Sequence, residues 1–250
     1  MNEKERRRYA RQIRLPRVGD AGQQRLLDAR VLIIGMGGLG SPVAMYLAAA
    51  GVGHLLLSDY DRVDESNLQR QIAHTQADIG ELKADSARRT LLAINPDITV
   101  EALDYELEET ELLAQARSAD LLIDCTDNFP SRFELNRASL TSGTPLISGA
   151  AIRWEGQVAA FDPRRGDSPC YRCLYRDEGV EGATCAMEGV ISPLVGVIGA
   201  MQALESVNLL LDRSALCGSL LLFDGWLMEW QKIRLPKNPH CSACGRGVKS

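Results

Sequence analysis

The stretch VLIIGMGGLGSPVAMYLAAAGV, residues 31–52, decides the fold of this 250-residue chain. Its first five residues are an apolar, partly β-branched run that ends in glycine, which is typical of a buried parallel strand. Residues 38–52 predict the helix that follows a glycine-rich turn. A strand, a glycine turn and a helix in this order indicate the start of a Rossmann-like α/β sheet.

Strands and helices alternate over the next hundred residues. The predicted strands cover residues 54–61, 98–103, 120–128 and 144–151, and the predicted helices between them cover residues 82–95, 109–119 and 131–143. This alternation implies a doubly wound, mostly parallel sheet that binds its ligands at the carboxyl ends of the strands.

The pattern changes after about residue 150. Residues 155–162 and the later segments SLLLFDG and EWQKIRL look like antiparallel strands beside a long helix near residues 193–211. No repeat or linker separates the two halves. We therefore expect a single domain over residues 1–250, with a helical N-terminal segment (1–28), a nucleotide-binding part (30–150) and a β-rich part (151–250).

Composition and charge exclude several classes of protein. With 45% hydrophobic and 24% charged residues, the chain is ordinary globular material, and its net charge of −5 predicts neither a nucleic-acid nor a membrane partner. The opening residues MNEKERRRYARQI lack the apolar stretch of a signal peptide, so we expect a cytoplasmic protein. The apolar run from Ile191 is interrupted by Gln202, Glu205 and Asn208, which favours a buried core helix over a membrane span.

The glycine turn carries the first functional signal. Gly35, Gly37 and Gly40 satisfy the G-x-G-x-x-G pattern, and Gly38 adds a fourth glycine. Missing side chains let a ligand approach the backbone, and the N-terminus of a helix favours an anion. Asp59 ends the next strand, where a carboxylate can accept hydrogen bonds from ribose hydroxyls. These features predict a nucleotide site. The default interpretation is an NAD-dependent oxidoreductase, and the alternative is a turn needed only for packing.

The residues after Asp59 separate the possible nucleotides. The segment SNLQRQ brings Asn67 and Arg70 to the ligand edge, and Lys83 opens the next predicted helix. A triphosphate needs such fixed cations as pyrophosphate departs, whereas a dinucleotide dehydrogenase does not. Asp127, in DCTDN, would repel a triphosphate unless it held Mg²⁺. The alternatives are surface ion pairs for the two cations and a helix N-cap for Asp127. Because Arg70, Lys83 and Asp127 are all expected at one edge of the sheet, the combination favours ATP with Mg²⁺.

Two C-x-x-C pairs lie late in the chain, at Cys170 with Cys173 and at Cys241 with Cys244. In a cytoplasmic protein, paired cysteines indicate a metal or redox site rather than disulfides. Four thiolates can surround one tetrahedral Zn²⁺, and they leave no open position for a substrate. The alternative is a redox dithiol at the first pair, but no thioredoxin-like context precedes it. The pairing predicts a structural zinc site.

The order of these motifs resembles that of the MoeB/ThiF family of ubiquitin-activating-enzyme-like adenylyltransferases. The resemblance spans about Tyr9 to Gly245 and rests on the cysteine pairs and on RYARQI, GMGGLGSP, SNLQRQ, DIGELKA, DCTDN and SGAAIRWEGQV. It implies that ATP activates the C-terminal glycine carboxylate of a small ubiquitin-like sulfur carrier ending in Gly-Gly, in molybdopterin or thiamine biosynthesis. Acyl-adenylate and pyrophosphate form ahead of thiocarboxylate formation. A further alternative is a non-catalytic, zinc-stabilised binding module on the same fold.

The resemblance also implies residue roles. The residues expected to bind ATP and Mg²⁺ are Gly38, Asp59, Asn67, Arg70, Lys83, Asp127 and Asn128, with Asp127 on the metal. Arg11 resembles an arginine that reaches into the active site of a partner subunit, which implies a homodimer with composite sites. The β-rich part would bind the carrier and zinc. The carrier's carboxylate is already ionised at neutral pH, so no catalytic histidine is expected.

Cys185 stands apart from the zinc pairs. It lies in the glycine-containing acidic stretch GVEGATCAMEG, which predicts an exposed, mobile segment. In some members of the family, a cysteine at this position receives the carrier or the sulfur, and in others it is not used. Nearby Glu181 and Glu188 disfavour a thiolate, so the residues alone leave its role open. We expect a separate sulfurtransferase or cysteine desulfurase as the sulfur donor.

Overall fold

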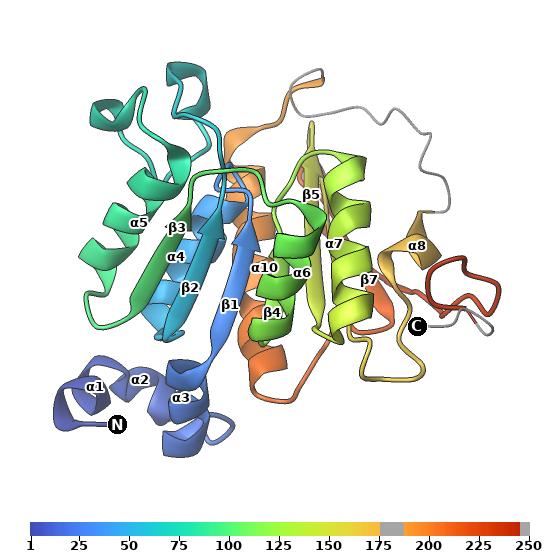
Figure 1. Cartoon of the computed structure of the whole chain (residues 1–250), viewed down its shortest axis with the longest axis horizontal. Helices are drawn as coiled ribbons and strands as arrows, with labels where there is room; N and C mark the ends of the chain where they lie inside the picture. The colour runs from blue at the N-terminus through green and yellow to red at the C-terminus, as the bar shows by residue number, and fades with distance from the viewer. Residues whose placement is uncertain (176–187, 246–250) are drawn as a thin grey trace.

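The computed structural model describes residues 1–175 and 188–245 and is built on one eight-stranded sheet (Figure 1). The strand order is β3-β2-β1-β4-β5-β6-β7-β8. The strands are β1 (Arg30–Ile34), β2 (His54–Ser58), β3 (Thr99–Leu103), β4 (Leu121–Asp124), β5 (Leu146–Ile152), β6 (Glu155–Phe161), β7 (Ser219–Asp224) and β8 (Glu229–Arg234). Strands β1 to β5 are parallel, and β6, β7 and β8 add antiparallel pairs. The predicted α/β class with an antiparallel continuation is confirmed.

Helices cover both faces of this sheet (Figure 1). On one face lie α4 (Gly40–Ala50), α5 (Lys83–Ile94) and α10 (Ser192–Leu210), and on the other lie α6 (Glu109–Ser118), α7 (Phe129–Ser142) and α8 (Tyr171–Leu174). Short helices α1 (Glu3–Arg8), α2 (Ala10–Ile13) and α3 (Gly19–Asp28) precede the sheet, and two 3₁₀ turns, η1 (Glu65–Asn67) and η2 (Gln76–Asp78), follow β2.

The burial of β1 explains why its sequence is apolar throughout. Val31 and Ile33 face the core beneath α4 and α10, whereas Leu32 faces the core beneath α6 and α7. A parallel strand covered on both faces needs apolar side chains at every position rather than at alternate ones. The strands end earlier than predicted, however. β2 ends at Ser58 and β4 at Asp124, so the polar residues that follow belong to loops at the sheet edge.

Helix α10 is, in the part of the chain that the structure describes, the one helix long and apolar enough to cross a membrane. It packs against β4, β5, β6 and α4, and more than half of it is buried. Its polar residues point inward: the Gln202 amide donates to the Asp124 carbonyl at 2.8 Å, and Glu205 accepts from the Leu216 N–H at 2.9 Å. The prediction of a buried core helix is confirmed.

The N-terminal helices dock at the far end of α4, at the amino ends of the strands (Figure 1, blue). Tyr9 is buried there, and its hydroxyl accepts a hydrogen bond from Asn95 at 2.9 Å. The tyrosine ring lies against Gly51, the left-handed C-cap of α4, where a Cβ would come within 2.5 Å of Tyr9 Cζ. Gly143 caps α7 with a similar φ of +78°, but no atom lies within 4 Å of its Cβ position.

This pair of glycines gives a matched test of the docking. We expect Gly143→Ala to lower the free energy of unfolding by about 1–2 kcal/mol, the cost of a left-handed alanine. Gly51→Ala should cost a further 1–3 kcal/mol, about the cost of overpacking, because it must also displace Tyr9. Urea unfolding of both variants measures the difference. Equal losses would contradict a tight contact between Tyr9 and α4.

Candidate functional site

The loop between β1 and α4 has no room for a side chain at two of its glycines and little room at a third. Gly35 has a φ of +91°, and a Cβ there would lie 2.8 Å from the Cys125 carbonyl oxygen. A Cβ at Gly40 would lie 1.9 Å from the Gly35 carbonyl oxygen, and one at Gly38 would lie 3.1 Å from Val195 of α10. The glycines therefore let the loop pass between the end of β4 and α10.

Asp59 fixes this loop to the end of β2. Its Oδ2 accepts a hydrogen bond from the Met36 N–H at 2.7 Å, and its Oδ1 accepts one from the Asp61 N–H at 2.9 Å. Burial raises the pKa of the Asp59 carboxyl above its ordinary value, although the Lys83 ammonium and these hydrogen bonds oppose the rise. The carboxylate expected to bind ribose thus also holds the glycine loop in place.

A cavity of about 1360 Å³ opens at the carboxyl ends of β1, β2 and β4. Most of the predicted nucleotide residues line it, namely Gly38, Asp59, Arg70, Lys83, Asp127 and Asn128. Asn67 contacts this set from outside the lining, because its Oδ1 accepts a hydrogen bond from Arg70 at 3.3 Å. The fold therefore gathers residues from four separate segments around one space.

Two of the predicted cations differ in their present contacts. Lys83 is the first residue of α5, its side chain is 8% exposed, and its ammonium lies 2.7 Å from Asp61 Oδ2. Arg70 donates to the Ser66 carbonyl at 3.1 Å as well as to Asn67. Lys83 therefore does form an ion pair, as one alternative predicted, but both Lys83 and Asp61 line the cavity.

The helix cap beside the cavity is Asn128, not Asp127. Asn128 Oδ1 accepts a hydrogen bond from the Ser131 N–H at 3.0 Å, so the alternative that made Asp127 the N-cap of α7 is wrong. Asp127 is exposed on the cavity wall. Because Mg²⁺ takes six oxygen ligands, this one carboxylate fits a Mg²⁺ ion that obtains its other ligands from phosphates and water.

The sequence analysis missed a third cation, Arg132. Its guanidinium donates to the Thr126 carbonyl at 2.7 Å, and its Nε lies 3.7 Å from Asp124 Oδ2. Burial lowers the pKa of Arg132, but the Asp124 carboxylate and nearby tyrosines outweigh it and raise this pKa overall. Arg132 lies in the first turns of α7 and lines the cavity. Nothing in SRFEL distinguishes it from an ordinary helical arginine, because its position depends on how α7 packs over β4.

Arg11 is not brought to the cavity of its own chain. It lies in α2, and the neighbouring Gln12 side chain donates to the Ala50 carbonyl at 2.9 Å. Ala50 ends α4, whose 11 residues begin at the glycine loop. A helix of that length separates the two ends by about 16 Å, so α2 lies at the opposite end of the sheet from the loop (Figure 1).

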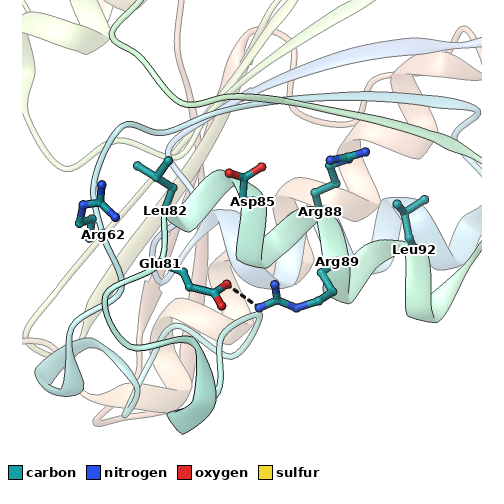
Figure 2. A pocket seen from close by; sticks show the side chains of 7 residues that line it. All are labelled: Arg62, Glu81, Leu82, Asp85, Arg88, Arg89 and Leu92. Atoms are coloured by element: carbon teal, nitrogen blue, oxygen red, sulfur yellow. Dashed lines mark hydrogen bonds and ion pairs between the residues drawn. The ribbon is translucent and has the colours of Figure 1, made fainter.

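A second hollow, of about 660 Å³, lies on the outer side of α5 (Figure 2). It is lined by Arg62, Glu81, Leu82, Asp85, Arg88, Arg89 and Leu92. Arg89 pairs with Glu81 at 2.7 Å, and Arg62 donates to the Gly80 carbonyl at 2.7 Å. Since two of its arginines already hold protein oxygens and its lining includes no predicted site residue, the sheet-edge cavity is the candidate active site.

The four paired cysteines meet in one cluster. Their Sγ atoms all lie within 4.8 Å of one another, with Cys170 3.7 Å from Cys241 and Cys173 3.5 Å from Cys244. Tetrahedral Zn²⁺ with 2.3 Å bonds places its sulfurs about 3.8 Å apart, so the cluster fits this ion. A hydrogen bond from Cys170 lowers the pKa of the Cys173 thiol, and a lowered thiol pKa favours the thiolate that a metal binds.

The other cysteines differ from this cluster. Burial raises the pKa of the Cys125 thiol well above its usual value, so this residue is an inert core side chain. Cys217 is partly buried, with its Sγ 3.4 Å from the Ser168 hydroxyl. Cys185 lies outside the described residues.

Comparison with known proteins shows full-length similarity to one family. The model of the ThiF family matches residues 9–243. The chain is 43% identical over 247 residues to the molybdopterin-synthase adenylyltransferase of Escherichia coli K12, covering 98% of this chain and 99% of that one. It is 44% identical over 245 residues to the sulfur carrier protein ThiS adenylyltransferase of the same organism, covering 98% and 97%. The crystal structure of E. coli MccB with ATP has the same fold, with a TM-score of 0.83 at 22% identity over 98% of this chain and 75% of that one.

The cysteine cluster predicts one zinc ion per chain. Protein purified without chelator should contain it, and Cys241→Ser should remove most of it and lower the free energy of unfolding by more than about 2 kcal/mol. Cys217→Ser is the matched control, because this residue lies outside the cluster and should leave the zinc content unchanged. Elemental analysis and urea unfolding measure both effects. Full zinc retention in Cys241→Ser would show that the cluster is not the metal site.

Proposed function

Because this chain belongs to the ThiF family, we propose that its sheet-edge cavity is the active site of an ATP-dependent adenylyltransferase. The substrate is a ubiquitin-like sulfur-carrier protein, whose C-terminal glycine carboxylate becomes an acyl-adenylate. The observation that carries this proposal is the gathering of the glycine loop, Asp59, Arg70, Lys83 and Asp127 around one cavity. The relatives named for adenylylating molybdopterin synthase and the carrier ThiS support it.

ATP would occupy the part of the cavity beside the glycine loop. The glycine loop leads into the N-terminus of α4, which favours an anion, so the phosphates would lie against Gly38. Asp59 accepts from the ribose hydroxyls, and Asn67 and Arg70 contact the phosphates. Lys83 would exchange Asp61 for a phosphate oxygen, a short movement because both side chains line the same wall.

The reaction needs positioning and fixed charge more than a protein nucleophile. The carrier's carboxylate oxygen bonds to the α-phosphorus, the bond from that phosphorus to the bridging oxygen breaks, and pyrophosphate leaves with the electron pair. Arg70 and Lys83 stabilise the charge that moves onto pyrophosphate. A Mg²⁺ ion held by Asp127 would supply further charge neutralisation on the phosphates. No general base is required, because the attacking carboxylate is ionised at neutral pH.

The rest of the cavity is proposed to receive the carrier's tail. It extends away from the glycine loop along β5 and β6, past Ala150, Gly156 and Gln157. An extended Gly-Gly end suits this space because it has no side chains. The hairpin of β7 and β8 offers an adjacent apolar surface for the folded part of the carrier, with Trp226 72% exposed and Met228 74% exposed.

We further propose that the enzyme is a cytoplasmic, single-domain homodimer. Arg11 lies at the opposite end of the sheet from its own cavity, so a role in catalysis would require the cavity of a partner subunit. A separate sulfurtransferase or cysteine desulfurase would supply the sulfur. Zn²⁺ would be held by the four clustered cysteines. Its role would be structural, because protein sulfurs fill all four coordination positions and leave none for a substrate.

The experiment that tests the function is ATP–pyrophosphate exchange with a panel of small carriers ending in Gly-Gly. We expect exchange with at least one carrier and none without a carrier. Binding of ATP and of NAD is measured in parallel, and only ATP should bind. Binding of NAD with no exchange by any carrier would overturn the proposal in favour of an oxidoreductase.

Two substitutions test the phosphate residues. Arg70→Ala and Asp127→Ala should each lower carrier-dependent exchange at least about 100-fold, as loss of a group that stabilises transition-state charge does. Arg88→Ala and Asp85→Ala are the matched controls, because these residues line the outer hollow of Figure 2 and should leave exchange unchanged. Urea unfolding confirms that all four variants fold. Wild-type exchange in Arg70→Ala or Asp127→Ala would refute the assigned roles.

Cys185 is tested by separating adenylation from sulfur transfer. Because adenylation requires no thiol, Cys185→Ala should leave pyrophosphate exchange within about twofold of the wild type. Thiocarboxylate formation, followed by intact-carrier mass spectrometry with a sulfur donor present, shows whether the later step uses this thiol. Loss of exchange in Cys185→Ala would instead place the thiol in the adenylation step.

A further inference from the structure

His74 lies behind the glycine loop, outside the lining of the cavity. Its side chain is buried, and both ring nitrogens are engaged. Nδ1 lies 2.9 Å from the Ser86 hydroxyl, and Nε2 lies 3.0 Å from the Met36 carbonyl oxygen. The sequence analysis assigned this histidine no role, because the chemistry proposed for the cavity needs no proton transfer from an imidazole.

The contact with Met36 fixes which nitrogen carries the proton. A carbonyl oxygen can only accept, so Nε2 donates to it and Nδ1 accepts from the hydroxyl when the ring is neutral. Burial lowers the pKa of His74, which favours this neutral form. His74 therefore links Ser86 to the glycine loop through two hydrogen bonds, accepting from the Ser86 hydroxyl and donating to the Met36 carbonyl.

Side chains hold both backbone polar groups of Met36. Its N–H donates to Asp59 and its carbonyl accepts from His74, while the Met36 side chain is completely buried. Glycines on both sides give the loop many accessible conformations, each of which would point the loop amides differently. Two side-chain contacts on the one non-glycine residue at the start of the turn select a single conformation.

His74 also lies next to the segments that carry the proposed phosphate cations. Its imidazole bonds to Ser86, which lies one helical turn after Lys83 in α5, and its backbone N–H donates to the Gln71 carbonyl, next to Arg70, at 3.1 Å. The imidazole thus joins the glycine loop to α5, and the backbone of the same residue belongs to the Arg70 turn. A shift of the ring would move the glycine loop relative to α5.

We propose that His74 is a positioning residue for the nucleotide, and that its Nε2–H holds the Met36 carbonyl so that the glycine loop is ready to bind phosphate before ATP arrives. This inference rests on the proposed function in taking ATP as the ligand. Preorganisation of this kind lowers the conformational cost of binding, so its loss should weaken ATP binding even in a protein that remains folded.

Two substitutions separate positioning from general stability. A glutamine amide can take the place of Nε2 and donate to Met36, whereas an asparagine amide reaches only the place of Nδ1, beside Ser86. We expect His74→Gln to bind ATP within about threefold of the wild type and His74→Asn to bind about five- to tenfold more weakly, which corresponds to one hydrogen bond. Calorimetric titration with ATP alone gives both constants, and urea unfolding gives both stabilities.

Several outcomes would overturn the proposal. Equal ATP affinities in His74→Gln and His74→Asn would mean that the Met36 contact does not position the loop. The same conclusion would follow if the loss of ATP affinity in each variant were proportional to its loss of free energy of unfolding. If the wild type binds no ATP, the proposed function is wrong instead. NMR on the free protein tests the hydrogen bond from His74 Nε2–H to the Met36 carbonyl without any ligand. His54 Nε2 also has an acceptor, Glu101 at 2.6 Å, but only the His74 ring is buried, so His74 should show the slowest Nε2–H exchange of the three histidines, with His54→Gln and His240→Gln supplying the assignment. Rapid exchange at that position would overturn the proposal even if the variants failed to fold.

Discussion

The close approach of Gly35 to the end of β4 is the constraint on which the site depends. β1 and β4 are neighbours in register, with Ile34 beside Asp124, so the loops after them leave the sheet side by side. From here β2 and β3 extend one way and β4 and β5 the other. Loops that diverge at such a reversal leave a crevice between them. Because a Cβ at Gly35 would lie 2.8 Å from the Cys125 carbonyl oxygen, the two loops can run this close together only with glycine at this position.

Buried polar contacts make the floor of this crevice rigid. Asp124 accepts from the Ser148 hydroxyl at 2.5 Å and lies 3.7 Å from Arg132, while its carbonyl accepts from Gln202. The contacts join β4 to β5, α7 and α10, the elements that surround it. In a low-dielectric interior such bonds are strong when satisfied and costly when broken, so alternative arrangements of the floor are disfavoured. Helix α10 thus contributes to the site through a buried amide, which accounts for Gln202 on an otherwise mostly apolar inward face.

The sequence predicts what depends on neighbouring residues and fails where contacts cross the fold. The apolar β1 and its glycine loop are recognisable because strand, turn and helix signals are local. The cysteine cluster is predictable although 67 residues separate Cys173 from Cys241, because each pair carries its own spacing. The helix cap is different: Asp127 and Asn128 are both good caps, and only the backbone decides between them. The positions of Arg132 and His74 depend on how helices pack, which no local pattern records.

The cysteine cluster and the sheet-edge cavity lie in different parts of the molecule and are held by different contacts. Strand β8 is exposed along its whole length, and among residues 1–175 and 188–245 it pairs only with β7, so the described strands hold it on one side. The chain after it returns to α8, where the Asn238 N–H donates to Cys173 Sγ at 3.4 Å and Cys241 and Cys244 complete the cluster. A metal there would fasten the edge of the antiparallel half, the part proposed to hold the carrier. The nucleotide residues are fixed instead by Asp59, His74 and the end of β4. The part proposed to hold the carrier and the part proposed to hold ATP are therefore stabilised by separate sets of contacts.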